Sequence, residues 1–110
     1  MATKYRLELE KLKCIRKQDT VGRDEPELKV DGVTVYGPGN LGKGDSVTLN
    51  RSALFITNAL VQLIEVDAGS NDDMGTVTVK GSADVGKGSR VKEFHRTHSD
   101  YELTYEVVAA

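Results

Sequence analysis

The chain has 110 residues, of which 38% are hydrophobic and 29% charged, so it suits one soluble globular domain and is too short for two. Its 15 Lys and Arg against 17 Asp and Glu give a net charge of −2, which argues against strong electrostatic binding to nucleic acid. No apolar run could form a transmembrane segment, and no signal peptide is visible. The single cysteine excludes an internal disulfide. These features favour the cytoplasm, although a domain excised from a secreted protein would look the same.

The first predicted strand runs from Lys4 to Cys14. Its apolar residues alternate with charged ones, which is the pattern of a strand with one buried face. The alternation breaks once, at Lys11, where a β-bulge would restore it. The apolar positions are Tyr5, Leu7, Leu9, Leu12 and Cys14.

The middle of the chain predicts several more strands. Leu28–Tyr36 contains two short alternating runs around Asp31-Gly32, a pair typical of a hairpin turn. Ser46–Leu49 alternates again, and Ala53–Val66 is the most apolar stretch of the chain. The polar pair Thr57-Asn58 divides this stretch into two strands, although a single buried helix would also explain its composition.

Two further strands are predicted toward the C-terminus. Gly75–Lys80 alternates, and Tyr101–Val108 places every second residue on one apolar face. Between them, Gly81–Asp100 is polar and shows no sustained period, so we expect a mobile segment there. Seven or eight short strands, eleven glycines and no convincing helix predict an all-β fold, an antiparallel β-sandwich or barrel that forms one domain over residues 1–110.

Three features imitate catalytic or metal-binding motifs. Gly37–Gly42 matches the dinucleotide-binding pattern G-x-G-x-x-G, but a strand rather than a helix follows it, so glycine-rich turns are expected. His95 and His98 lie three residues apart in a polar region, which favours solvent-exposed histidines over zinc ligands. Cys14 shares the apolar phase of its strand and should be buried. The chain shows no catalytic arrangement, so it is not expected to be an enzyme.

Two acidic segments are the strongest candidates for a functional site. Asp19–Glu27 follows the first predicted strand, and Glu65–Gly75 connects two later ones. Both combine acidic residues with glycine, and Ca²⁺ takes about six to eight hard oxygen ligands in flexible geometry. Asp and Asn are also common in turns because they bond to nearby backbone, so a purely structural role is the alternative.

The order of these segments and strands resembles that of a C2 domain. Gly22-Arg-Asp-Glu-Pro26 is similar to part of the first calcium loop of C2 domains, and Glu65-Val-Asp67 followed by Asp72-Asp-Met-Gly75 is similar to the third. The likeness spans residues 4–80, with Tyr101–Val108 as the last strand, and is nearest to divergent bacterial C2-like sandwiches. It implies an eight-stranded antiparallel β-sandwich that holds Ca²⁺ between these loops at one end.

The resemblance also implies metal ligands, position by position. Asp19 matches the first aspartate of the first loop, and Glu25 stands where the second belongs, with Asp24 beside it. The third loop supplies Glu65 in place of its first aspartate, then the matching Asp67 and Asp72, and the additional Asp73.

A calcium-binding module of this kind would bridge to anionic lipid or to a protein partner. C2 domains use bound ions to join their carboxylates to lipid headgroups, and the loop tips here offer Thr20, Val21, Arg23 and Met74. Val21 and Met74 would insert shallowly, and Arg23 would meet a phosphate. We therefore expect calcium-dependent membrane or protein binding. The alternative is a calcium-independent β-sandwich that serves as a protein–protein interaction or structural module.

Overall fold

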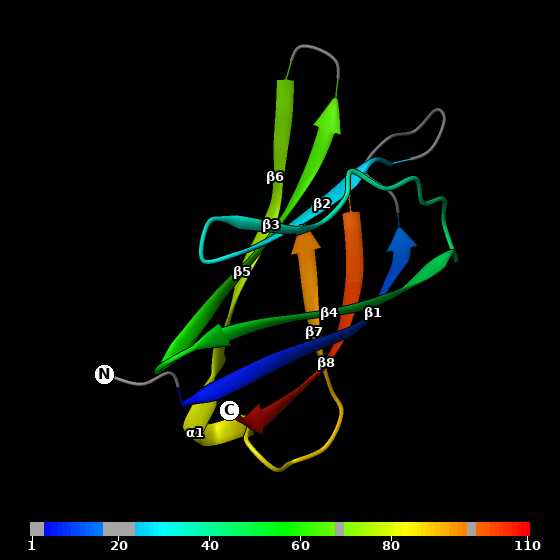
Figure 1. Ribbon diagram of the computed structural model, residues 1–110. Coiled ribbons are helices and arrows are strands. Elements are labelled where there is room, and N and C mark those ends of the chain that lie inside the picture. Colours follow the sequence, from blue (N-terminus) through cyan, green and yellow to red (C-terminus); the bar gives the residue numbers. More distant parts are fainter. Residues whose placement is uncertain (1–3, 17–23, 68–69, 97–98) are drawn as a thin grey trace.

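Strands with one buried face build two antiparallel sheets that pack against each other as a β-sandwich (Figure 1). The computed structural model describes residues 4–16, 24–67, 70–96 and 99–110. The sandwich is elongated, with extents of 45 × 26 × 23 Å. In chain order the elements are β1 (Tyr5–Arg16), β2 (Pro26–Val30), β3 (Val33–Tyr36), β4 (Ser46–Phe55), β5 (Asn58–Asp67), β6 (Ser70–Lys80), α1 (Gly81–Asp84), β7 (Arg90–Arg96) and β8 (Ser99–Ala109).

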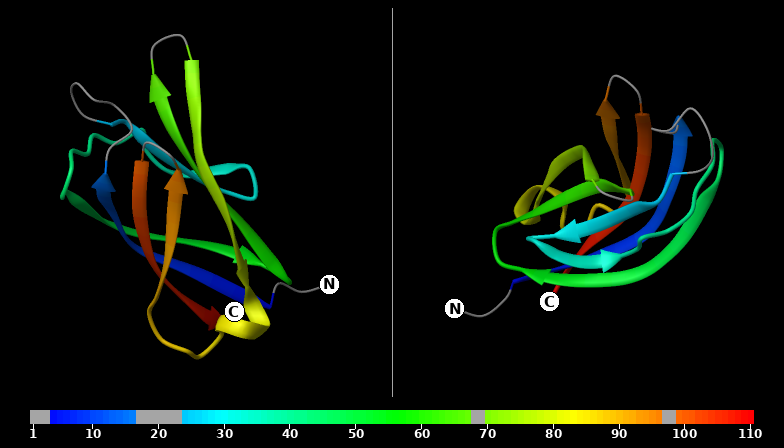
Figure 2. Two further views of the ribbon diagram at one scale, coloured as in Figure 1. Left: turned by 180° about the vertical axis from the view of Figure 1, so that it is seen from behind. Right: turned by 90° about the horizontal axis from the view of Figure 1, so that it is seen from above.

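Each sheet has four strands. One has the order β4-β1-β8-β7 and the other β3-β2-β5-β6. Across the two layers, β3 lies near β4 and β6 lies near β7, so the two orders run in the same direction and β8 lies opposite β5 (Figure 2). The predicted all-β antiparallel sandwich is therefore confirmed.

The central pair β1 and β8 supplies much of the core. Their inward residues are almost completely buried, and the alternation predicted at both ends of the chain is confirmed. The register of β1 shifts between Leu9 and Lys11 against both of its neighbours, which confirms the predicted bulge. The inward residues of the pair are Leu7, Leu9, Leu12 and Cys14 from β1 and Tyr101, Leu103, Tyr105 and Val107 from β8.

The β2–β3 hairpin forms where the sequence predicted it. Asp31 and Gly32 have φ angles of 50° and 83°, and a two-residue hairpin turn of this hand needs positive φ at both positions. The turn is tied to the neighbouring strand because the Leu60 backbone N–H donates to Asp31 Oδ1 at 2.9 Å. The following apolar stretch also contains the predicted break, since β4 ends at Phe55 and β5 begins at Asn58. Ala53–Phe55, however, is the end of β4 rather than a separate strand.

The segment Gly81–Asp100, for which we predicted mobility and no regular pattern, is largely regular structure in its described residues 81–96 and 99–100. It contains the single helical turn α1, the edge strand β7 and the start of β8. The seven residues of β7 include one buried side chain, Phe94, so the strand leaves no alternating apolar pattern in the sequence. Pairing with β8 through backbone hydrogen bonds, rather than burial, defines this strand.

The second acidic segment was predicted as a loop and is mostly strand. Asp72 and Asp73 lie in β6, and their chain pairs with β5 through a register shift between Leu63 and Ile64. Met74 is the extra residue of this bulge and is fully buried. Its predicted place at a membrane-inserting loop tip was therefore wrong, while Thr20, Val21 and Arg23 lie outside the described residues.

Candidate metal centre

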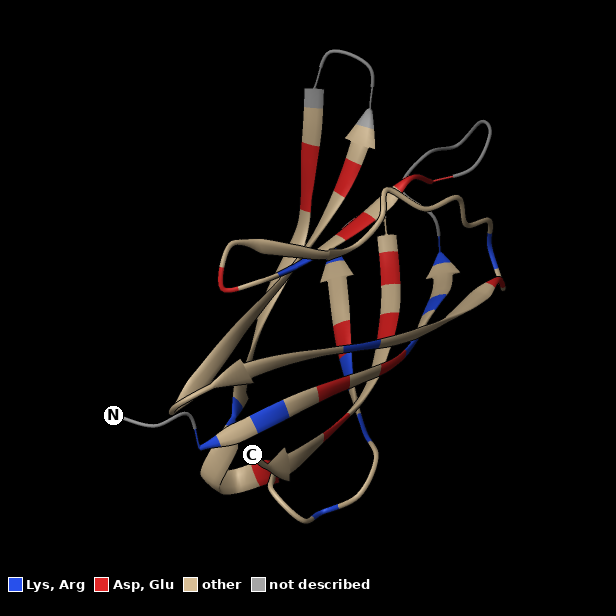
Figure 3. Ribbon diagram, viewed as in Figure 1, with Lys and Arg blue, Asp and Glu red and all other residues tan. Residues whose placement is uncertain are grey.

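One end of the sandwich brings acidic strand ends together. β1, β5 and β7 finish there, while β2, β6 and β8 begin there (Figure 1). We call this region the loop end. Acidic residues mark β2, β5, β6 and β8 near it (Figure 3).

Glu65 is a buried carboxylate at the loop end. It continues the inward phase of β5 after Val61 and Leu63, and only 1% of its surface is exposed. The Glu25 backbone N–H donates to Glu65 Oε2 at 2.6 Å, and the Val66 N–H donates to the Glu25 carbonyl at 3.0 Å. A buried carboxylate needs such donors because burial otherwise disfavours its charge. The backbone of the Asp24–Pro26 segment thus fixes the position of Glu65.

Asp24 is a second buried carboxylate at the loop end, and it is fully buried. Its backbone exchanges two hydrogen bonds of 2.9 Å with Leu41, which anchors the segment before β2. The Tyr101 hydroxyl donates to Asp24 Oδ2 at 2.5 Å from β8 in the opposite sheet. Burial, the hydrogen bond to Asp24 and contact with Cys14 all raise the pKa of Tyr101, so this tyrosine stays a neutral donor.

Asp72 adds a third carboxylate beside Glu65. The two residues are direct cross-strand partners in the β5–β6 pair, so their side chains leave the same face of the sheet. Glu65 is buried and Asp72 is exposed, so the pair runs from the interior to the surface. Like charges placed opposite each other on neighbouring strands repel, and a bound cation would offset that repulsion.

The remaining predicted ligands are not brought into this group. Glu25 lies between the buried residues Asp24 and Pro26, and its side chain is exposed on the alternate phase. Asp73 accepts a hydrogen bond from the Gly75 N–H at 2.9 Å and pairs with Arg96 of β7 at 3.0 Å. Asp19 and the side chain of Asp67 lie outside the described residues.

The three acids do not form a metal-binding group in the described structure. Among residues 4–16, 24–67, 70–96 and 99–110, no group of three or more His, Cys, Asp or Glu side chains lies close enough to hold a metal ion. The donor type nevertheless suits a hard cation such as Ca²⁺, because the group consists of carboxylates rather than thiolates or imidazoles.

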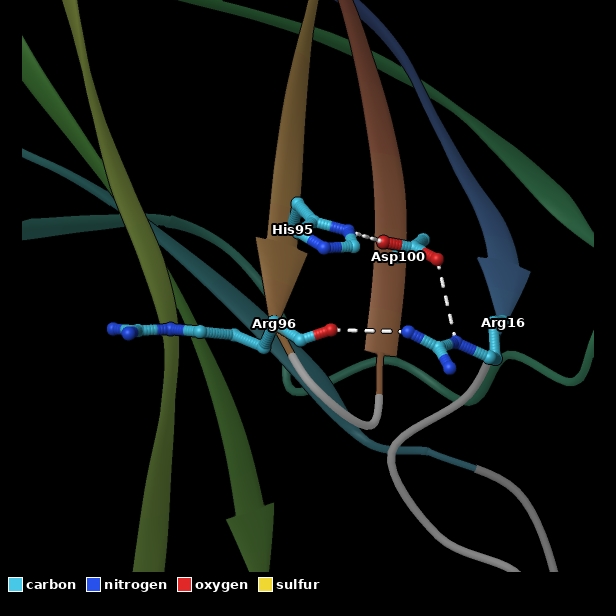
Figure 4. A network of polar contacts seen from close by, with 4 residues as sticks. All are labelled: Arg16, His95, Arg96 and Asp100. Atoms are coloured by element: carbon cyan, nitrogen blue, oxygen red, sulfur yellow. Dashed lines mark hydrogen bonds and ion pairs between the residues drawn. The ribbon is translucent and has the colours of Figure 1, made fainter.

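A polar network closes the outer face of the loop end (Figure 4). Arg16 Nε lies 3.3 Å from Asp100 Oδ2, and Arg16 Nη2 donates to the Arg96 carbonyl at 3.0 Å. His95 Nδ1 contacts Asp100 Oδ1. The network joins the end of β1 to β7 and β8. His95 is exposed, as predicted, and His98 lies outside the described residues.

Sequence reasoning missed Ser99. This residue begins β8, and its side chain is fully buried at the loop end. The alternation that identified Tyr101 and Leu103 as inward-facing would have reached Ser99 if it had been extended two residues back. Its polarity and its place in a segment expected to be mobile concealed it.

The fold is similar to that of solved C2 domains. A structure described as a C2 domain matches with a TM-score of 0.62 and 12% identity over 99% of both chains. The calcium-bound C2A and C2B domains of Extended-Synaptotagmin 2 match with a TM-score of 0.57 and 14% identity, over 96% of this chain and 45% of that one. Human GIVD cytosolic phospholipase A2 in complex with methyl gamma-linolenyl fluorophosphonate matches with a TM-score of 0.61 and 16% identity, over 98% of this chain and 17% of that one.

These similarities concern the fold. No family model and no curated protein matches the sequence. No helix in the described part of the chain is long and apolar enough to span a membrane.

Proposed function

We propose that this chain, whose fold is that of a C2 domain, is a non-enzymatic module that binds Ca²⁺ at the loop end. The observation that carries the proposal is the placement of Glu65 directly opposite Asp72 on one face of the β5–β6 pair. The buried Asp24 lies at the same end, on the segment that donates to Glu65. One of the similar structures is a calcium-bound C2 protein, which supports the same assignment.

On binding, Asp24, Glu65 and Asp72 would have to move closer together to supply carboxylate oxygens to one ion, because no three acids lie close enough in the described part of the chain. The hydrogen bonds from Tyr101 to Asp24 and from Glu25 to Glu65 would orient two of these ligands, a role that neighbouring donors commonly play around metals. Asp19 and Asp67, which the C2 resemblance also implies as ligands, would add two more carboxylates. The ion itself would neutralise the acids and tie β2, β5 and β6 together.

A thermal melt of the chelated protein with and without millimolar Ca²⁺ tests the proposal, with Mg²⁺ as a control ion. Ligand linkage adds about 2.7 kcal/mol of stability when the free ligand is a hundred times Kd, so the expected rise in melting temperature is several degrees. The double variant Asp67→Asn, Asp72→Asn should lose most of that rise. A double variant that keeps the full rise would exclude this site.

A matched control removes two acids elsewhere. Glu8 and Glu106 are cross-strand partners in the β1–β8 pair, remote from the loop end. The double variant Glu8→Gln, Glu106→Gln changes the net charge equally and should keep the calcium response. A loss of the response in this control would point to general electrostatics rather than a built site.

A calcium-independent interaction module is the second candidate. The observation in its favour is that protein donors already engage Asp24, Glu65 and Asp73, the last through Arg96. Such a module would bind a protein partner or serve a structural role, and its stability and oligomeric state would not change when EGTA is added.

If Ca²⁺ does bind, flotation with vesicles of anionic and of neutral lipid would then separate a membrane partner from a protein one.

A further inference from the structure

Ser99 carries a buried polar atom without an assigned role. The residue is 0% exposed, and its Oγ has no hydrogen-bond partner among the residues that the structure describes. Burying a hydroxyl without a partner costs about 1–3 kcal/mol on mutational scales. Native proteins contain few such groups, and each one calls for a bound water, ion or other partner.

The topology places Ser99 opposite the acids. Ser99 continues the inward phase of Tyr101 on β8, and β8 lies opposite β5 across the sandwich. The position of Ser99 along the strands follows from an ion pair that joins the adjacent edges of the two sheets. Arg96 pairs in register with Ser99 and contacts Asp73, and Asp73 pairs with Ile64, the residue next to Glu65. Ser99 and Glu65 therefore lie at nearly the same level on facing surfaces.

The distance between the two sheets would allow residues from both sheets to bind one cation. Packed sheets lie about 10 Å apart, so a glutamate from one face and a serine from the other can bring their oxygens within one coordination shell. Tyr101, one step further into the core, already spans this gap to reach Asp24 at 2.5 Å. The orphan hydroxyl thus lies beside an interlayer contact with a proposed calcium ligand.

We propose that Ser99 is part of the cation site and supplies a hydroxyl oxygen from the sheet opposite Glu65 and Asp72. The inference rests on the proposed calcium function and extends it, because a ligand on β8 would make the ion join the two sheets rather than only the strands of one. A hydroxyl is a neutral oxygen donor, so it adds a ligand without adding to the repulsion among the carboxylates.

Ser99→Ala tests this inference through calcium affinity and stability. Calorimetric titration with Ca²⁺ should show a Kd roughly tenfold higher than in the wild type, the size of effect usual for a lost supporting group at a metal. The melting temperature in EGTA should stay the same or rise, because the variant removes an unsatisfied polar group. Ser52→Ala, at an exposed serine of β4, is the matched control and should change neither value.

Two results would overturn the role of Ser99. One is a Ser99→Ala protein that binds Ca²⁺ as tightly as the wild type, which would leave the hydroxyl to a buried water. The other is a Ser99→Ala protein with a markedly lower melting temperature in EGTA and an unchanged Kd, which would make the hydroxyl structural. If the alanine variant does not fold, Ser99→Cys keeps a similar shape but replaces the hard oxygen with sulfur, and it should show the same weakening.

The wild-type titration separates this inference from the proposed function. No calcium binding by the wild type would overturn both. Normal binding by the wild type together with normal binding by Ser99→Ala and Ser99→Cys would overturn only the assignment of Ser99.

Discussion

Two buried tyrosines on β8 make similar bonds in different settings. Tyr101 donates to Asp24 toward the loop end, and Tyr105 donates to Asp84 at 2.8 Å toward the opposite end. Asp84 ends the helical turn α1 and also lies 3.6 Å from Arg90, so its charge is balanced by a cation. Asp24 belongs to an end where Glu65 and Asp72 add negative charge. At one end Arg90 of the protein pairs with the aspartate that accepts the tyrosine bond, whereas under the proposed calcium function a bound ion would balance the acids of the loop end.

Removing each tyrosine hydroxyl should give the largest contrast between the ends. Tyr101→Phe takes a hydrogen bond from a fully buried carboxylate and should destabilise the protein by about 1.5–3 kcal/mol. Tyr105→Phe should cost about 1 kcal/mol, because Arg90 still contacts Asp84. Urea unfolding of both variants checks the difference. An equal or greater cost for Tyr105→Phe would remove the contrast.

Alkaline pH should first weaken the end of the sandwich that holds Tyr105 and Asp84. Burial and the hydrogen bond to Asp84 raise the pKa of Tyr105 from 10.0 to about 12. A raised tyrosine pKa means that the folded protein holds this proton more tightly, so stability falls as pH rises from about 10 to 12. The stability advantage of the wild type over Tyr105→Phe should therefore be full below pH 10 and shrink across that window. Melting curves of the two proteins at matched pH measure the gap, and a constant gap would contradict the assignment.

The edge ion pair at the loop end should have the smallest effect. Asp73 and Arg96 are both about half exposed, and exposed pairs are worth about 0.2–1 kcal/mol. Arg96→Ala should therefore lower stability by less than about 1 kcal/mol, and the loss should diminish at high salt. Unfolding at low and high ionic strength checks this. A large, salt-independent loss would show that Arg96 does more than neutralise Asp73.

The sequence predicted those parts of the fold that depend on strand phase. Tyr101–Val108 alternates because half of its side chains fill the core, and Asp31-Gly32 marks a turn that needs positive φ. β7 escaped prediction because Phe94 is its one buried residue and its pairing depends on backbone hydrogen bonds, which leave no side-chain pattern.

The candidate site was only partly readable for a related reason. Composition identified acids near the chain reversals, but the face on which each acid lies depends on register. The bulge at Met74 shifts the phase within β6, so Asp72 shares the face of Glu65 while Asp73 reaches Arg96. Ser99 lies buried at the loop end, and its position relative to the acids depends on how the two sheets stack, which no local sequence pattern encodes.

The central position of the first and last strands also has a kinetic consequence. β1 and β8 are neighbours in the middle of one sheet, and Tyr5 pairs with Ala109. This pairing must close a loop of nearly the whole chain before its contacts repay the lost conformational entropy. Folding should therefore be slow for a domain of this size, on a scale of about milliseconds to seconds. Until β8 docks, β1 stays an open edge that can pair with a second molecule.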